Sequence, residues 1–266
     1  MFSRLWIGLA ALPLLLLVLG ALLITGGPSV SGADTGIGTG TYTPLSSAPP
    51  FATSTLAPEP AFVTAIPSGP GALTALLVHR TVMRSRPNGP KIASLGLRSQ
   101  FGSPVVMGVA RVEGGWLGVV SPVAGNARLG WIPRADATLT RVNYQLEVSL
   151  SQRKLTVLDE GHVVERYTIA VGKPSAPTPT GRFAITDRLN PGDPTGPYGC
   201  CILATSALAP HAIQDWSGGN RIAIHSTPET SSIGLPVSHG CMRLTLPEGQ
   251  WLLDHIPLGT PLLIRE

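Results

Sequence analysis

Two histidines and a cysteine lie within one short segment of the chain, IHSTPETSSIGLPVSHGCMRL, at residues 224–244. The whole sequence has only six histidines and three cysteines. A thiol is mostly protonated at neutral pH, so a nucleophilic cysteine needs a nearby base, and imidazole is a common one. His225, His239 and Cys241 therefore indicate a cysteine nucleophile with its base, a metal site, or ordinary buried residues.

The residues between His225 and Cys241 favour a chain that turns back on itself. Turn-forming residues in this stretch are Ser231, Ser232, Gly234 and Pro236. Such a turn brings His225, at the end of an expected strand, beside the thiol. Gly240 leaves room for a substrate and lets successive backbone N–H groups converge on an oxyanion. These features favour nucleophilic chemistry.

Zinc is the alternative for the same three side chains, because imidazole and thiolate are both good zinc ligands. His239 and Cys241 are separated by one residue, whereas zinc ligand pairs are usually two to four residues apart. No second ligand pair with that spacing is visible in the sequence. We expect no metal and no other cofactor, and sensitivity to chelators would separate zinc from thiol chemistry.

Four segments resemble motifs of the YkuD-type L,D-transpeptidases. That family's signature reads as a His, a spacer, then Ser or Thr, His, Gly, Cys, an apolar residue and Asn or Arg. The segments are IHST at 224–227, SHGCMR at 238–243, TPTGRF at 178–183 and GPYG at 196–199. The resemblance extends over residues 143–264, nearly the whole carboxyl-terminal unit.

The resemblance implies a β-sandwich-like catalytic domain that remodels bacterial peptidoglycan. Cys241 would attack the carbonyl of the third residue of a donor tetrapeptide stem and expel the terminal D-alanine. An amine on a neighbouring stem peptide would then resolve the thioester into a 3→3 cross-link. If water resolved the thioester instead, the same residues would make an L,D-carboxypeptidase.

The resemblance also implies roles for the residues around Cys241. His225 would be the base that activates the thiol, and Ser226 would orient its imidazole. His239, Gly240 and Cys241 would contribute the oxyanion pocket.

Two further residues are candidates for substrate binding. Arg243 would support the loop or meet a substrate carboxylate, and a structural salt bridge is the alternative. Tyr198 would lie at the substrate cleft, or else pack in the core or a hairpin.

Cys200 and Cys201 are adjacent, and an odd cysteine count leaves at least one thiol free in an oxidising compartment. A disulfide between neighbouring residues is geometrically strained. We therefore expect both to be reduced and buried in a strand, with Cys241 free. The alternative hypothesis is that one of the two pairs reversibly with Cys241 and switches the enzyme off.

Residues 1–25 are predicted to be a membrane anchor or signal sequence. Residues 5–24 form an uncharged, mostly apolar run that is long enough to cross a bilayer. Arg4 precedes this run, and the next Lys or Arg is Arg80, so the carboxyl side is expected outside the cytoplasm. We expect an uncleaved anchor in the bacterial membrane and a catalytic domain in the cell envelope; cleavage after residues 31–33 would give a secreted protein.

Two folded units are expected after a linker. Residues 26–75 are rich in Pro, Gly, Ser and Thr and cannot bury enough surface to order themselves. Residues 76–140 contain short strands with a turn at 86–89, and GGWLGVVSPVAGNARLGWIP resembles a bacterial SH3-like domain. Trp116 and Trp131 of that unit are expected to pack in a core more than to line a ligand groove. The strands expected in this unit are 76–83, 105–113, 116–121 and 130–132.

Residues 141–266 are expected to form the catalytic domain. Apolar and polar residues alternate over 142–150, which is typical of a half-buried strand, and 159–162 reads as a hairpin turn. Thr245 and Glu248 have the spacing of a capping box ahead of a short helix. Further strands are expected at 155–158, 163–171, 182–186, 202–205, 221–225 and 261–264. The chain is therefore predicted to be mainly β, with an SH3-like barrel, a β-sandwich-like catalytic domain and a short carboxyl-terminal helix.

The charge of the chain limits its partners. Its formal net charge is +4 and its isoelectric point is about 9.3, which suggests affinity for an acidic polymer or surface. It has no Arg/Lys run and no basic patch interleaved with aromatic residues, so we expect no nucleic-acid partner. A non-catalytic wall-binding protein is the rival function, but adhesion alone needs no activated thiol.

Overall fold

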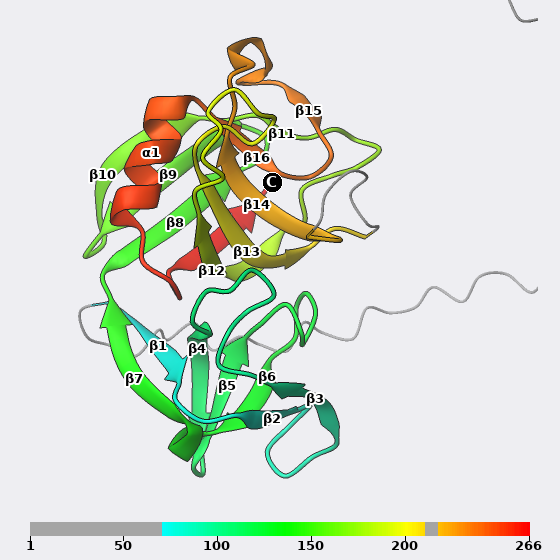
Figure 1. The fold of residues 1–266 in the computed structure, drawn as a ribbon, viewed down its shortest axis with the longest axis vertical. Coiled ribbons are helices and arrows are strands. Elements are labelled where there is room, and N and C mark those ends of the chain that lie inside the picture. Colours follow the sequence, from blue (N-terminus) through cyan, green and yellow to red (C-terminus); the bar gives the residue numbers. More distant parts are fainter. Residues whose placement is uncertain (1–70, 211–217) are drawn as a thin grey trace, which may run out of the picture. The chain divides into compact units, whose positions relative to one another are not determined.

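The computed structural model describes residues 71–210 and 218–266. The predicted membrane segment at 5–24 and nearly all of the predicted linker lie outside these residues. Within the described part of the chain, no helix is long and apolar enough to cross a membrane. That part is mainly β, as predicted, with a single α-helix (Figure 1).

The amino-terminal region is a seven-stranded sheet in the order β3-β2-β6-β5-β4-β1-β7 (Figure 1). All of its strand pairs are antiparallel. Its elements are β1 (Ala72–Leu77), β2 (Thr81–Arg84), β3 (Lys91–Leu95), β4 (Val106–Glu113), β5 (Trp116–Val120), β6 (Gly130–Pro133), the 3₁₀ helix η1 (Arg134–Asp136) and β7 (Ala137–Val142). The sheet surrounds a core of Ala75, Leu77, Met83, Met107, Leu117, Val119, Ala124 and Ile132.

The structure corrects one strand prediction in this region. Residues 76–83 form parts of two strands, β1 and β2, and not one. Both the Val78 and His79 N–H groups donate to the carbonyl oxygen of Asp136, at 3.0 and 3.3 Å. The chain therefore turns at this point instead of continuing as a strand.

The tight turns of this region occur at residues that favour turns. The hairpin between β4 and β5 turns at Gly114 and Gly115, whose φ angles are +50° and +82°. Gly89 N–H donates to the Arg86 carbonyl in the predicted turn, at 2.9 Å. Trp131 is buried, but it is not one of the eight core residues of the seven-stranded region. Its ring packs against Gly118 instead.

The carboxyl-terminal region is an eight-stranded mixed sheet in the order β10-β9-β8-β17-β12-β13-β14-β16. The pairs β8–β17 and β14–β16 are parallel, and the others are antiparallel. Its strands are β8 (Tyr144–Ser149), β9 (Lys154–Asp159), β10 (His162–Thr168), β12 (Gly181–Leu189), β13 (Ile202–Leu208), β14 (Arg221–Ser226), β16 (Met242–Leu244) and β17 (Pro261–Arg265). A separate parallel pair joins β11 (Val171–Gly172) to β15 (Pro236–Ser238), and η2 (Thr230–Ser232) precedes β15.

Local sequence signals account for several of these elements. In β8, Leu146 and Val148 are buried while Glu147 and Ser149 are not, so the half-buried strand predicted at 142–150 is confirmed over 144–149, whereas Val142 ends β7. Glu160 and Gly161 both have positive φ and form the predicted turn between β9 and β10.

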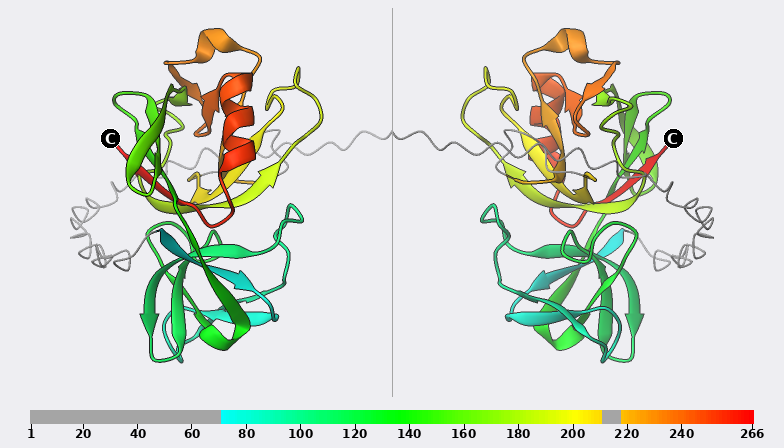
Figure 2. Two further views of the ribbon diagram at one scale, coloured as in Figure 1. Left: turned by 90° about the vertical axis from the view of Figure 1, so that its left-hand side faces the viewer. Right: turned by 90° about the vertical axis from the view of Figure 1, so that its right-hand side faces the viewer.

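The helix α1 (Leu246–His255) begins at the predicted capping box. The Thr245 backbone N–H donates to the Glu248 carboxylate at 2.9 Å, which satisfies a donor that no helical carbonyl can reach. Leu252 and Ile256 join the large core that the sheet encloses. The helix contacts β13 and β14, and Figure 2 shows it standing alongside the curved sheet.

Candidate active site

The β14–β16 register separates core residues from site residues. Ile224 pairs with Met242, and both side chains lie in the large core. Successive side chains of a strand point to opposite faces. His225 pairs with Arg243, so these two residues lie together on the other face of the sheet.

Cys241 lies just before β16 and is a free thiol with 8% of its surface exposed. It packs in a small apolar cluster with Ile202 and Ala223, and its Sγ accepts a hydrogen bond from the Ala223 N–H at 3.4 Å. Burial raises the pKa of the Cys241 thiol, and the Ala223 N–H and the Arg243 cation oppose that rise. The resting thiol is therefore protonated, and it would need a base in order to react as a nucleophile.

His225 is almost fully buried and is held in one tautomer. Its Nδ1 lies 2.8 Å from the Ser226 carbonyl oxygen. A carbonyl oxygen can only accept, so Nδ1 carries the proton and Nε2 is left as an acceptor. Burial lowers the pKa of His225 to about 4; the Ser226 carbonyl opposes this effect and Arg243 adds to it. The imidazole is therefore an unprotonated base at neutral pH.

The loop that carries Cys241 is fixed by two buried hydroxyl groups that the sequence analysis did not single out. Ser238 Oγ donates to the Cys241 carbonyl at 2.5 Å and accepts from the Gly240 N–H at 3.0 Å. Thr178 Oγ1 donates to the Gly240 carbonyl at 2.8 Å and accepts from the Gly172 N–H at 2.9 Å. Both residues stand inside the motifs quoted above, which was the only signal for them.

Gly240 itself has a φ of +113°, a conformation that favours glycine. A Cβ atom there would lie 2.7 Å from Cδ1 of Ile222, so side chains are excluded by space as well as by backbone conformation. The Gly240 N–H is already bonded to Ser238, which leaves the neighbouring amides of the loop as the candidates for binding an oxyanion.

His239 is exposed, and its Nε2 lies 3.1 Å from Nζ of Lys173. An ammonium group can only donate, so Nε2 accepts this hydrogen bond. Lys173 gave no signal in the sequence. Across residues 71–210 and 218–266, no three His, Cys, Asp or Glu side chains are grouped as a metal site would require.

Arg243 adds positive charge close to both His225 and Cys241, since it lowers the pKa of each. Its Nε is buried and has no hydrogen-bond partner. The ion pairs of the described residues are Arg221 with Asp187 and Arg265 with Glu147, so Arg243 is not in a salt bridge there.

Comparisons with known proteins match this region of the chain. The family model for the YkuD L,D-transpeptidase catalytic domain matches residues 143–264. The YkuD protein of Bacillus licheniformis is 36% identical over 120 residues, which cover 45% of this chain and 64% of that protein. The protein of the same name from Bacillus subtilis is 35% identical over 125 residues, covering 47% of this chain and 67% of that protein. The chain belongs to the YkuD family of L,D-transpeptidase catalytic domains.

The match covers about two thirds of the length of these two relatives. An L,D-transpeptidase from Mycobacterium smegmatis is similar in structure, with a TM-score of 0.36 and 20% sequence identity, over 57% of this chain and 90% of that one. The family model covers the carboxyl-terminal region, and the seven-stranded sheet lies outside the residues that it matches.

Tyr198 lies beside His225 in the YkuD domain. Its ring meets that of His225 edge-on, with centroids 4.9 Å apart and planes at 66°. It is half-buried and also packs against the apolar cluster that contains Cys241. The structure thus brings His225, Cys241, Arg243 and Tyr198 together on this side of the sheet.

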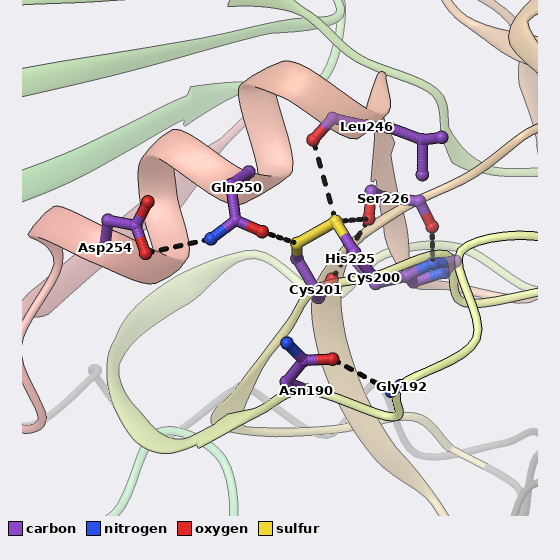
Figure 3. Close-up of a disulfide and its surroundings, with 9 residues drawn as sticks. All are labelled: Asn190, Gly192, Cys200, Cys201, His225, Ser226, Leu246, Gln250 and Asp254. Carbon is purple, nitrogen blue, oxygen red and sulfur yellow. Dashed lines mark hydrogen bonds between the residues drawn. A yellow bond between two sulfur atoms is a disulfide. The ribbon is translucent and has the colours of Figure 1, made fainter.

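The expectation for Cys200 and Cys201 was wrong, because the two residues form a disulfide with each other (Figure 3). That expectation placed both in a strand, where adjacent side chains point to opposite faces. In the structure β13 starts only at Ile202, and Gly199 turns the chain with a φ of +57°. The pair therefore lies in a loop, and Cys241 has no disulfide partner.

Proposed function

We propose that this chain is a peptidoglycan L,D-transpeptidase of the bacterial cell envelope with Cys241 as nucleophile. The observation that carries the proposal is the bond from His225 Nδ1 to the Ser226 carbonyl, which leaves Nε2 as a base on the face of the sheet that also bears the free thiol. A neutral thiol and a neutral imidazole on the same side of the sheet are the resting state that a cysteine–histidine nucleophile requires.

In the acylation step, His225 Nε2 takes the thiol proton while Cys241 Sγ attacks the carbonyl of the third residue of a donor stem. Backbone N–H groups of the loop on either side of Gly240 stabilise the oxyanion. The intermediate collapses to a thioester and the terminal D-alanine leaves with the proton held by the imidazole.

In the second step, an amine of a neighbouring stem peptide attacks the thioester. His225 accepts the amine proton, and the thiol leaves from the tetrahedral intermediate with a 3→3 cross-link as product. Arg243 and Tyr198 flank the site, where the guanidinium binds a carboxylate of the stem. Resolution by water gives the L,D-carboxypeptidase product from the same acyl-enzyme.

The remainder of the chain fits a tethered enzyme. We place an anchor or signal at residues 1–25, a linker from 26 to about 71, an SH3-like β domain at about 72–142 and the catalytic domain at about 143–266, because β1 begins at Ala72 and β7 ends at Val142. The apolar run at 5–24 and the Pro-rich stretch after it support this division.

The test is the intact mass of a fragment starting at about residue 71, before and after exposure to a carbapenem. We expect one covalent adduct on the wild type and none on Cys241→Ala. Tetrapeptide stems with and without an acceptor amine then distinguish cross-linking from hydrolysis. A folded, reduced wild type that forms no adduct and releases no D-alanine would refute the proposal.

A further inference from the structure

The Cys200–Cys201 disulfide is joined to the proposed base through one residue. The Ser226 N–H and Oγ both donate to the Cys201 carbonyl, at 2.9 and 3.5 Å, and the same Oγ lies 3.4 Å from Cys200 Sγ. The carbonyl of the same serine accepts the His225 Nδ1 proton. The disulfide loop thus holds Ser226, and Ser226 sets the tautomer of His225 (Figure 3).

Ser226 has no space in which to shift independently of its neighbours. A Cβ at Gly199 would lie 2.6 Å from Ser226 Oγ, and a Cβ at Gly249 would lie 2.7 Å from Ser226 Cβ. Gly199 immediately precedes the disulfide and Gly249 belongs to α1. A movement of the disulfide loop must therefore displace Ser226 or push it against the helix.

Both sulfur atoms face acceptors that a disulfide cannot use. Cys201 Sγ lies 3.3 Å from Oε1 of Gln250, and Cys200 Sγ lies 3.7 Å from the Leu246 carbonyl (Figure 3). The orientation of the Gln250 amide is fixed because its Nε2 donates to Asp254. A disulfide sulfur has no proton, whereas each thiol of the reduced pair has one to donate. The surroundings therefore suit the reduced pair as well as the oxidised one.

We infer that the Cys200–Cys201 disulfide is a redox-controlled positioning element for His225, an inference that rests on the proposed function. The oxidised pair holds Ser226 and the base in place. Reduction opens the ring formed by the two side chains and their shared peptide, and the thiols turn to their acceptors on α1. The Cys201 carbonyl and Ser226 then lose their fixed positions, and His225 is oriented less well.

The reductant is a dithiol, and Cys200 is the accessible sulfur because it is half-buried while Cys201 is 1% exposed. A thiolate of the dithiol attacks Cys200 Sγ, the Sγ–Sγ bond breaks, and Cys201 leaves as a thiolate that takes up a proton. The second thiol of the reductant attacks the mixed disulfide and releases Cys200. Two electrons and two protons pass to the protein, and the reductant becomes a cyclic disulfide.

The experiment compares oxidised and dithiothreitol-reduced protein in the release of D-alanine from a tetrapeptide stem. Intact mass after alkylation verifies the redox state of the pair, and re-oxidation with glutathione disulfide tests reversibility. We expect reduction to lower kcat about three- to tenfold with little change in KM, as for a misplaced base, and re-oxidation to restore it.

The Cys200→Ser, Cys201→Ser double variant is the matched control. It is expected to have the kcat of the reduced wild type and to be insensitive to dithiothreitol. If this variant does not fold, the comparison of the two wild-type forms decides alone. Equal kcat in both wild-type forms would overturn the inference while leaving the proposed function intact, whereas no turnover in either form and no carbapenem adduct would overturn the proposed function.

Discussion

The two β regions of this protein differ most in the polar groups that they bury. Among the described residues, the seven-stranded region buries three polar side chains: Thr74, Thr81 and Ser121. The YkuD domain buries twelve: Thr178, Thr186, Asp187, Thr205, Ser206, Arg221, His225, Ser226, Thr227, Ser232, Ser238 and Thr260. A buried polar group destabilises a fold unless it is hydrogen-bonded, so each of these groups requires a specific partner.

The hydrogen bonds of these buried hydroxyl groups join different parts of the structure in the two regions. In the seven-stranded region, the Thr74 hydroxyl bonds the Thr140 hydroxyl across β1 and β7, which fastens one strand to another. In the YkuD domain, Thr178 and Ser238 bond the backbone of the loop that carries the thiol. The first kind of bond contributes to stability, and the second also sets the geometry of a site.

The largest expected effect is the loss of kcat on replacing His225, compared with replacing a histidine outside the site. His225→Gln should lower kcat about 10²- to 10⁴-fold because the thiol loses its base, whereas His162→Gln, at an exposed position of β10, should leave kcat unchanged. In the wild type, kcat/KM should fall as the pH drops through about 4, where His225 becomes protonated. Steady-state kinetics from about pH 3 to about pH 8 span the full titration of His225 and check both expectations.

The same histidine makes folding depend on pH. Its pKa of about 4 in the folded state is below the unfolded value of about 6.5, so the unfolded chain binds more protons between these values. This contribution to stability is complete above about pH 6.5 and is lost as the pH falls towards 4. Denaturant titrations should show it in the wild type and not in His225→Gln; equal pH dependence in both would contradict it.

An intermediate effect is expected from two glycines with positive φ, one in each region. Gly240→Ala is strained and meets Ile222, so it should destabilise by roughly 1–3 kcal/mol and reduce carbapenem acylation. Gly115→Ala is strained but has open space around it, so it should cost about 1–2 kcal/mol and leave acylation unchanged. Thermal unfolding and acylation rates measure the two effects separately. Normal acylation by Gly240→Ala would show that the loop geometry is not required.

The smallest expected effect compares two buried threonines. Thr178→Val and Thr74→Val each remove a buried hydrogen-bonding hydroxyl and should each destabilise by about 1–3 kcal/mol. Only Thr178→Val should also lower kcat/KM, by about tenfold, because it releases the Gly240 carbonyl. Equal losses of activity in the two variants would remove the distinction between the regions.

Patterns within a few residues predicted much of the fold. Alternation in 144–149, the turn at Glu160 and Gly161, and the Thr245–Glu248 capping box all depend on contacts between near neighbours in sequence. The break between β1 and β2 could not be predicted in this way, because the acceptor is the carbonyl of Asp136, more than fifty residues along the chain.

For the site, the sequence by itself determined which residues are the candidates for chemistry, because a thiol, two imidazoles and a glycine stand in one short segment that matches the YkuD family. Only the tertiary structure decided how they are used. The tautomer of His225, the resting protonation of Cys241 and the pairing of Cys200 with Cys201 depend on burial, strand register and a turn at Gly199. The residue type determines which reactions a group can undergo, whereas desolvation and fixed hydrogen-bond partners determine its resting protonation state.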